Sequence, residues 1–175
     1  MSESDVTGQL ARYMAQARER NLAPHVEREA RHRILDTLAA MVSGAHLKPG
    51  EMAIRYARAQ GGTAEAIVLT TNIVTSAVNA ALVNGMFAHA DETDDFEPVT
   101  KAHPGSAVVP AALAMAEREG RSGAELLAAV TLGYDVCCRF LLALGPDRVR
   151  ASHRSAEGTS STLGAVAAAA SLARL

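Results

Sequence analysis

Residues 74–90 read VTSAVNAALVNGMFAHA, and this stretch decides the fold class. Val78, Leu82 and Met86 recur every four residues, and alanine, the strongest helix former, is the commonest residue of the stretch. A helix that is apolar almost all the way round must be buried, either against neighbouring helices or against a second subunit. The segment therefore predicts a protein built from closely packed helices.

The rest of the chain supports the same all-α class. Alanine occupies 36 of the 175 positions, whereas tryptophan is absent and phenylalanine and tyrosine number three each. This composition favours helices over sheets, so we expect a single helical, bundle-like domain over residues 1–175, with at most one short β segment at Ala66–Leu69. Helices are expected at about Asp5–Glu19, Pro24–Val42, Pro49–Gly61, Val74–Ala90, Pro104–Glu119, Gly123–Leu144 and Thr162–Leu175.

Composition excludes several function classes. The chain has 17 Lys and Arg against 19 Asp and Glu, without the clustered cationic surplus that nucleic-acid binding needs. No apolar stretch of the length of a membrane span is free of charged and turn residues, so no transmembrane helix is expected, and the polar start is no signal peptide. The adjacent Cys137 and Cys138 make no disulfide framework, which favours the cytoplasm.

The last segment, residues 162–175, is made almost entirely of small apolar residues. A helix at the end of a chain usually has one polar face, and this one has almost none. We therefore expect it to pack on something outside the chain.

Two polar loops interrupt the apolar background. The first runs from Asp91 to His103 and holds five acids, and the second runs from Asp147 to Ser161 and includes Ser152–Thr159. Acids and histidines at helix ends can transfer protons when they converge in a cleft, because imidazole titrates near neutral pH. Loops on a rigid scaffold are where such groups usually lie.

Two other interpretations of the first loop are open. Its carboxylates can act as helix caps or as a solvated turn, which is the commoner role of such residues. Acidic loops also bind divalent cations through oxygen, but the spacing here matches no EF-hand or other known metal loop, so no metal site is assigned. The residues that offer themselves as metal ligands are His89, Asp91, Asp94, Asp95 and His103.

Several motifs, in order along the chain, resemble those of the MmgE/PrpD family. They are AALVNG at 80–85, AHADETDD at 88–95, HPG at 103–105, GYDV at 133–136 and TLGA at 162–165. The resemblance implies a helical domain accompanied by a smaller α+β lid domain, usually in homodimers. It also implies dehydratase, decarboxylase or epimerase chemistry on small di- and tricarboxylic acids, with no metal or organic cofactor.

The resemblance also assigns candidate catalytic residues. The histidine of the family's His-Pro motif corresponds to His103, a proton-transfer group, while Glu92 and Asp94 correspond to the acidic motif that orients it or serves as a second acid. The nearest match to the family's second histidine is His153, which lies further from Thr162 than the family spacing requires. Ser155 or Glu157 is the alternative occupant of that position.

Substrate binding is assigned to residues of both loops. Lys101 and Arg154 are candidates for holding the anion, and Asp91, Asp95 and Ser155 complete the expected binding set. Arg148 and Arg150 are further cations of the second loop, although none of these cations matches the lysines that the family uses on its lid. Phe96 stands where many members carry a threonine, which removes one polar contact.

Three functional hypotheses follow, because family members are much longer than 175 residues. The chain is a subunit of a split enzyme whose lid lies on another polypeptide, or a stand-alone homodimer with an altered substrate, or a non-catalytic helical interaction module. In the first two, the partner is a small carboxylic acid, with no nucleic acid and no membrane.

Overall fold

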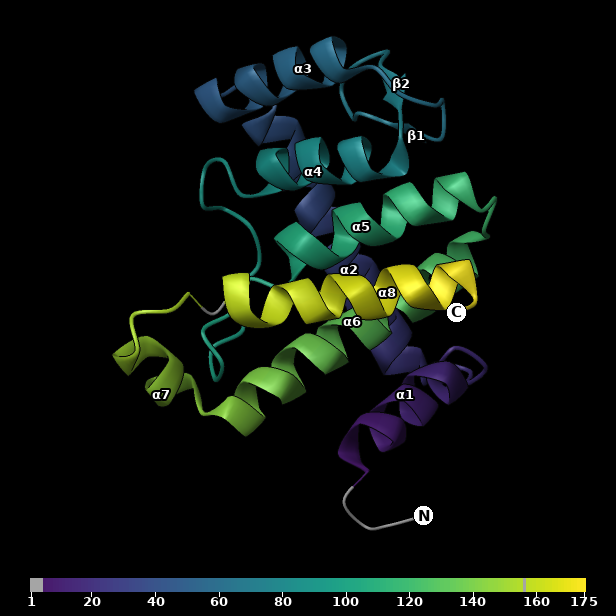
Figure 1. Cartoon of the computed structure of the whole chain (residues 1–175), viewed down its shortest axis with the longest axis vertical. Coiled ribbons are helices and arrows are strands. Elements are labelled where there is room, and N and C mark those ends of the chain that lie inside the picture. The colour runs from purple at the N-terminus through teal and green to yellow at the C-terminus, as the bar shows by residue number, and fades with distance from the viewer. Residues whose placement is uncertain (1–4, 156) are drawn as a thin grey trace.

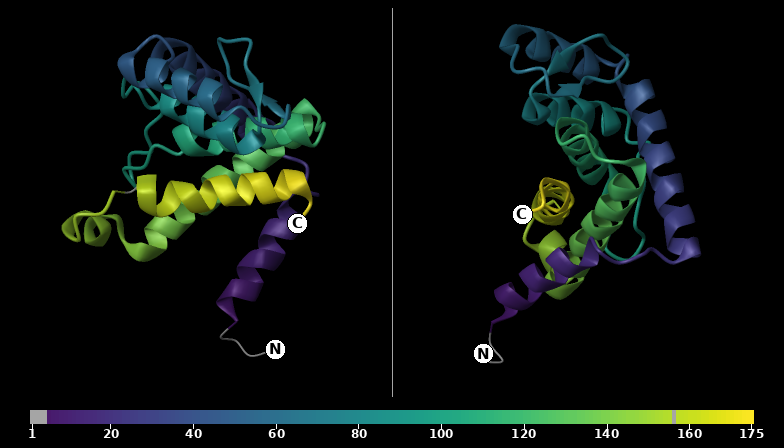
Figure 2. Two further views of the ribbon diagram at one scale, coloured as in Figure 1. Left: turned by 45° about the horizontal axis from the view of Figure 1, so that its top comes forward. Right: turned by 90° about the vertical axis from the view of Figure 1, so that its right-hand side faces the viewer.

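The computed structural model describes residues 5–155 and 157–175, and within them helices predominate, as the sequence predicts. Figure 1 shows α3, α4, α5 and α8 one below another, with α6 beneath α8 and α1 at the bottom, and the side view of Figure 2 shows α2 running along the back of this stack. The helices are α1 (Val6–Ala17), α2 (Pro24–Gly44), α3 (Lys48–Gln60), α4 (Ala77–Ala88), α5 (Gly105–Arg118), α6 (Gly123–Leu144), α7 (Pro146–Ala151) and α8 (Thr162–Ala173).

Local sequence signals set several of these helix ends. Pro24 occupies the first turn of α2, where its missing N–H costs no hydrogen bond. Ser122 and Glu125 form a reciprocal capping box at the start of α6. Gly145, at φ 82°, ends α6, and Pro146 begins α7 directly after it.

The expectation of at most one β segment is corrected to two short strands. β1 (Ala66–Ile67) pairs antiparallel with β2 (Val74–Thr75), in the register Ala66 to Thr75 and Ile67 to Val74. A strand needs a partner for its backbone groups, and residues 74–75 supply it instead of starting a helix. α4 accordingly begins later than expected, after Ser76, whose hydroxyl accepts from the Asn79 backbone N–H.

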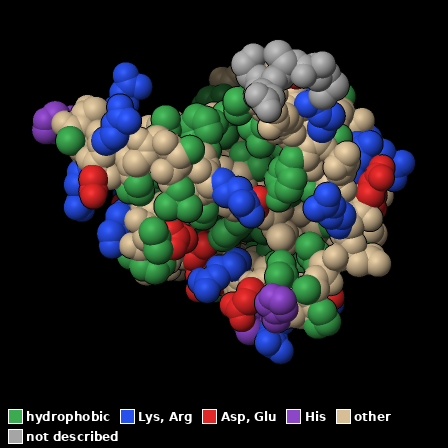
Figure 3. Space-filling model, turned by 90° about the horizontal axis from the view of Figure 1, so that it is seen from below, with side chains coloured by type: hydrophobic (Ala, Val, Ile, Leu, Met, Phe, Trp, Pro, Cys, Tyr) green, Lys and Arg blue, Asp and Glu red, His purple; other side chains and the backbone are tan. Residues whose placement is uncertain are grey.

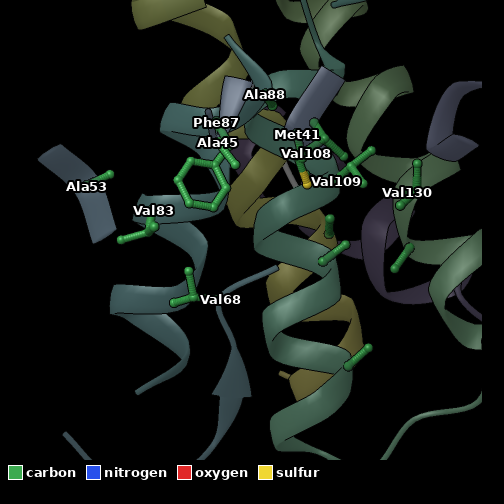
Figure 4. Packing of buried hydrophobic residues seen from close by; sticks show 14 of the residues in the cluster. Met41, Ala45, Ala53, Val68, Val83, Phe87, Ala88, Val108, Val109 and Val130 are labelled. Atoms are coloured by element: carbon green, nitrogen blue, oxygen red, sulfur yellow. The ribbon is translucent and has the colours of Figure 1, made fainter. Parts of the chain in front are cut away.

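The main core is built from medium-sized and small side chains. Figure 4 shows Phe87 of α4 facing the layer that holds Met41 of α2 and Val108 and Val109 of α5. All four side chains are buried. Such a core needs close helix approach to leave no voids, which explains the high alanine content.

The apolar end of the chain is covered from within, which corrects the expectation of an outside partner for it. α8 packs against α5 and α6, and Ala167, Ala168 and Leu172 are buried there. A Cβ added to Gly164 would lie 2.6 Å from the carbonyl oxygen of Gly133, so α6 and α8 touch backbone to backbone. This close approach requires glycine at the crossing.

α4 is buried on one side only. Val83 and Phe87 are buried, whereas Val78, Leu82 and Met86 are exposed and form a row that we call the α4 stripe. Neighbouring helices therefore bury one face of α4, as expected, and the α4 stripe lies on the opposite, exposed face.

α6 is long and apolar enough to cross a membrane by length and composition alone. It also carries the ion pair between Asp135 and Arg139 (2.6 Å), and it packs against α8, α5 and α2. Contacts of this kind are typical of the central helix of a helical core.

The second polar loop is more ordered than its composition predicts, since it contains α7 and the π-helical turn Glu157–Ser161. Val149 of α7 packs with Ala102 of the first loop on Cys137 and Leu141 of α6. We call these four residues the loop anchor, because they hold both polar loops to the same helix.

Candidate functional site

Three side chains, those of His89 and of Asp94 and His103 in the first loop, converge between the end of α4 and the start of α5. His89 follows the last residue of α4, and His103 lies two residues before α5. The Nδ1 atom of His89 lies 3.1 Å and 3.2 Å from the two carboxylate oxygens of Asp94. The Nδ1 atom of His103 lies 3.4 Å from Oδ1 of the same carboxylate, and the two imidazole rings meet edge to face at 5.6 Å.

Burial makes Asp94 the fixed member of this group. Its side chain is fully buried, whereas those of His103 and His89 are 20% and 40% exposed. A buried carboxylate next to Nδ1 favours the tautomer that carries its proton there, which leaves Nε2 as the basic atom. The arrangement can therefore accept and return a proton at an accessible imidazole.

Glu92 lies at the rim of the same group. Its Oε1 is 3.5 Å from Nε2 of His89, so it neighbours His89 rather than His103. Glu92 adopts a left-handed backbone conformation, at φ 58°, which is uncommon for a residue with a side chain. The exposed carboxylate is a second acid within reach of the histidine pair.

Asp95 points away from this group into the protein. Its Oδ1 accepts a hydrogen bond of 2.8 Å from the Gly105 backbone N–H, and the hydroxyls of Thr37 and Tyr134 lie around Gly105 as well. Burial raises the pKa of Asp95 above its ordinary value, against the lowering effect of the hydrogen bond from Gly105. Asp95 thus fixes the start of α5.

Asp91 is also engaged elsewhere. It accepts hydrogen bonds from the hydroxyls of Ser43 on α2 and of Thr93, and these bonds hold the pKa of Asp91 below its ordinary value. The contact ties the first loop to α2.

Phe96 and Lys101 border His103. The Phe96 ring lies 5.6 Å from the His103 ring, and the Lys101 ammonium lies 5.4 Å from the centre of the Phe96 ring. Half-exposed Phe96 thus forms an apolar wall between a base and a cation.

The second loop contributes less to this group. Within the described residues, no contact joins His153, Arg154 or Ser155 to the histidine pair. The Ser155 hydroxyl accepts from the Gly158 backbone N–H (2.8 Å) and so caps the π-helical turn. His153 is exposed, at φ 55°, and the side chain of Glu157 lies outside the described part of the chain.

Of the five residues that the sequence offers as metal ligands, three lie close enough together to hold one ion. His89, Asp94 and His103 each offer a ligand atom, and these atoms lie within 4.8 Å of one another. Two imidazoles and a carboxylate suit either proton transfer or a transition-metal ion. Asp91 and Asp95, also candidates from the sequence, are bound to other partners.

Sequence reasoning named His89 only as a possible metal ligand, and it missed Thr37 and Tyr134. His89 stands five residues before Asp94, directly after α4, and that position was the available signal. Thr37 and Tyr134 come from α2 and α6, far from the loop in sequence, so no local pattern links them to Asp95.

Comparisons with known proteins show which family the chain belongs to. The model of the MmgE/PrpD N-terminal domain matches residues 8–175. The cis-aconitate decarboxylase-like protein oryM of Aspergillus oryzae is 26% identical over 140 residues, which cover 76% of this chain and 29% of that protein. The cis-aconitate decarboxylase of Homo sapiens is 32% identical over 127 residues, covering 69% of this chain and 26% of that enzyme. The matched part of this chain thus spans less than a third of either relative.

Proposed function

Because the chain belongs to the MmgE/PrpD family through that family's N-terminal domain, we propose that it supplies the proton-transfer groups of a lyase acting on a small carboxylic acid. The two relatives are named for decarboxylation of cis-aconitate, which supports dehydratase or decarboxylase chemistry at the level of the family. A reducing cytoplasm is the expected setting, since Cys137 and Cys138 are free thiols.

One observation carries the proposal, namely the buried Asp94 carboxylate between the imidazoles of His89 and His103. Asp94 binds His89 by a hydrogen bond and lies 3.4 Å from Nδ1 of His103, where it can stabilise the protonated ring. We take His103 as the transferring group because its ring borders the partly apolar surface at Phe96. His89 and Glu92 form a second acid and base at the rim. General acid–base catalysis by such positioned groups contributes about 10²- to 10⁴-fold to a rate.

His103 accepts a proton in dehydration and donates one in decarboxylation. In dehydration, His103 takes a proton from the carbon next to a carboxylate, and the hydroxyl on the adjoining carbon leaves as water after protonation by the second acid. In decarboxylation, the bond to one carboxylate breaks, carbon dioxide leaves, and protonated His103 gives its proton to the carbon skeleton that keeps the electron pair. Dehydration starts from the neutral His103 imidazole, and decarboxylation starts from the protonated one. An imidazole group can supply either form near pH 7.

We further propose that the active enzyme contains a second polypeptide that carries the lid. The exposed α4 stripe of Val78, Leu82 and Met86 supports association with another chain. A stand-alone homodimer with an altered substrate is the second candidate, favoured by Phe96 beside His103. A non-catalytic interaction module is the third.

The native mass of the tagged chain, purified from its own host, separates these candidates. A complex with a second polypeptide supports the split enzyme, a homodimer that turns over substrate supports the stand-alone form, and an inactive chain without a lid partner supports the module.

Turnover is then followed by proton NMR on the purified species, with cis-aconitate and citrate as substrates. We expect His103→Ala to abolish turnover and the exposed His46→Ala to leave it unchanged. Equal turnover in His103→Ala and the native protein would overturn the catalytic assignment.

A further inference from the structure

Three cationic side chains surround a hollow of about 230 Å³ between the two polar loops. Lys101 and Thr100 line it from the first loop, and Asp147, Val149, Arg150 and Arg154 line it from α7 and the residues after it. Figure 3 shows Lys and Arg side chains spread over this face of the molecule, some of them at the left-hand edge, the side on which α7 lies in Figure 1. We call this hollow the basic hollow.

The loop anchor holds the two sides of the basic hollow together. Ala102 and Val149 are buried in the same apolar cluster on α6. Lys101 directly precedes Ala102, and Arg150 directly follows Val149. The backbone segments that carry these exposed cations are therefore held near each other by the burial of Ala102 and Val149, although they are distant in sequence.

A tight turn presents Lys101. The Glu97 carboxylate accepts hydrogen bonds from the Val99 N–H (3.1 Å), the Thr100 N–H (2.6 Å) and the Thr100 hydroxyl (2.6 Å). The Lys101 N–H donates to the Glu97 carbonyl oxygen (2.8 Å), and Lys101 is left-handed at φ 64°. A left-handed residue with a side chain costs energy and persists only where its surroundings hold it.

Charge in the basic hollow is unbalanced. It is lined by Lys101, Arg150 and Arg154 against one acid, Asp147. Among the described side chains, no carboxylate lies within ion-pair distance of any of the three cations, whereas other arginines of the chain, such as Arg31 and Arg139, are paired. Neighbouring like charges repel each other, and a bound anion relieves that repulsion through charge-assisted hydrogen bonds.

We propose that the basic hollow is an anion subsite for a carboxylate of a small polycarboxylic acid. The inference rests on the proposed function, because the acid that it binds is the substrate of the proton-transfer group. Phe96 relates the two places, since its ring centre lies 5.6 Å from that of His103 and 5.4 Å from the Lys101 ammonium. Arg150, which the sequence offered only as one of several candidate cations, becomes a substrate-binding residue together with Lys101 and Arg154.

Calorimetric titration with tricarballylate, a stable tricarboxylate, tests the subsite without any turnover. At low ionic strength we expect the native chain to bind it, and Arg150→Ala and Arg154→Ala each to weaken binding about tenfold, the loss typical of one hydrogen bond to a charged group. Asp147→Asn should strengthen binding, because it removes the acid of the basic hollow. Arg58→Ala on α3, which loses the same charge elsewhere on the surface, is the matched control.

Each result bears on the proposal. Unchanged binding in Arg150→Ala and Asp147→Asn, or no binding by the native chain, overturns it. Stronger binding of inorganic phosphate than of tricarballylate overturns the carboxylate assignment. If a His103→Ala chain binds tricarballylate, the subsite is supported even when no turnover is found. If the enzyme turns over but Arg150→Ala changes neither tricarballylate binding nor KM, the proposed function stands and the subsite is overturned.

Discussion

Oδ1 of Asp94 lies 3.1 Å from Nδ1 of His89 and 3.4 Å from Nδ1 of His103, so a single carboxylate oxygen neighbours both imidazoles. The first contact is a hydrogen bond, whereas the buried Nδ1 of His103 makes none with the described residues and is close enough to form an ion pair when the ring is protonated. The Asp94 side chain is fully buried, which removes competition from water for this oxygen.

Asp94→Asn should reduce turnover about 100-fold or more, because an amide keeps the size of the side chain but no longer stabilises a protonated imidazole. The measurement is kcat for the complex that turns over, compared with the exposed Asp36→Asn as control. A kcat within twofold of the native value would show that Asp94 plays no part in the reaction.

Gly105→Ala should destabilise the fold. A Cβ at this position would lie 2.5 Å from both Oδ1 of Asp95 and the Thr37 hydroxyl oxygen, and 2.8 Å from that of Tyr134. Forcing such groups apart costs about 1–3 kcal/mol of unfolding free energy. Urea denaturation measures the loss, and Gly123→Ala, whose Cβ would meet nothing within 4 Å, should change stability little.

Asp95→Asn should flatten the pH dependence of stability. Burial raises the pKa of Asp95 in the folded protein, so folding takes up a proton and the native protein loses stability as pH rises from about 4 through the folded pKa. The asparagine stays neutral and can still accept from Gly105. The unfolding free energy of the variant relative to the native chain should therefore rise over this interval and then level off, in urea titrations from pH 4 to 8. A constant difference would contradict the shifted pKa.

Val149→Ala should loosen both polar loops together. Val149 packs with Ala102 on α6, and removing two methyl groups from a buried site costs about 1–2 kcal/mol. Hydrogen exchange should then speed up at residues 97–102 as well as in α7, since both segments depend on the loop anchor. Val166→Ala on α8, which truncates a half-exposed valine, should leave both segments unchanged.

Much of the fold follows from local sequence. Pro24, Ser122 and Glu125 set helix ends through hydrogen bonds within a few residues, and the apolar spacing places the helices between them. The pairing of Val74 with Ile67 and the cover of α8 by α5 and α6 depend on contacts between distant residues, so periodicity alone could not predict them.

In the candidate site, too, some contacts could be predicted from local sequence and others could not. Asp94 and His103 share one short loop, so their approach is foreseeable from the motif, whereas Glu92 of the same loop contacts His89. Asp91 and Asp95 belong to the same run of acids, but their side chains go to Ser43 and Gly105, because a loop turns successive residues in different directions. The roles of His153, Arg154 and Ser155 remain predictions.

The position of Asp94 has a consequence for substitutions. Because this buried carboxylate lies within 3.4 Å of a nitrogen of each imidazole, a change at either histidine alters the surroundings of the other through it. The losses of turnover in single variants of His89 and His103 should therefore not add in the double variant. The unit that acts in this protein is the triad, and neither histidine has a separate share of the rate.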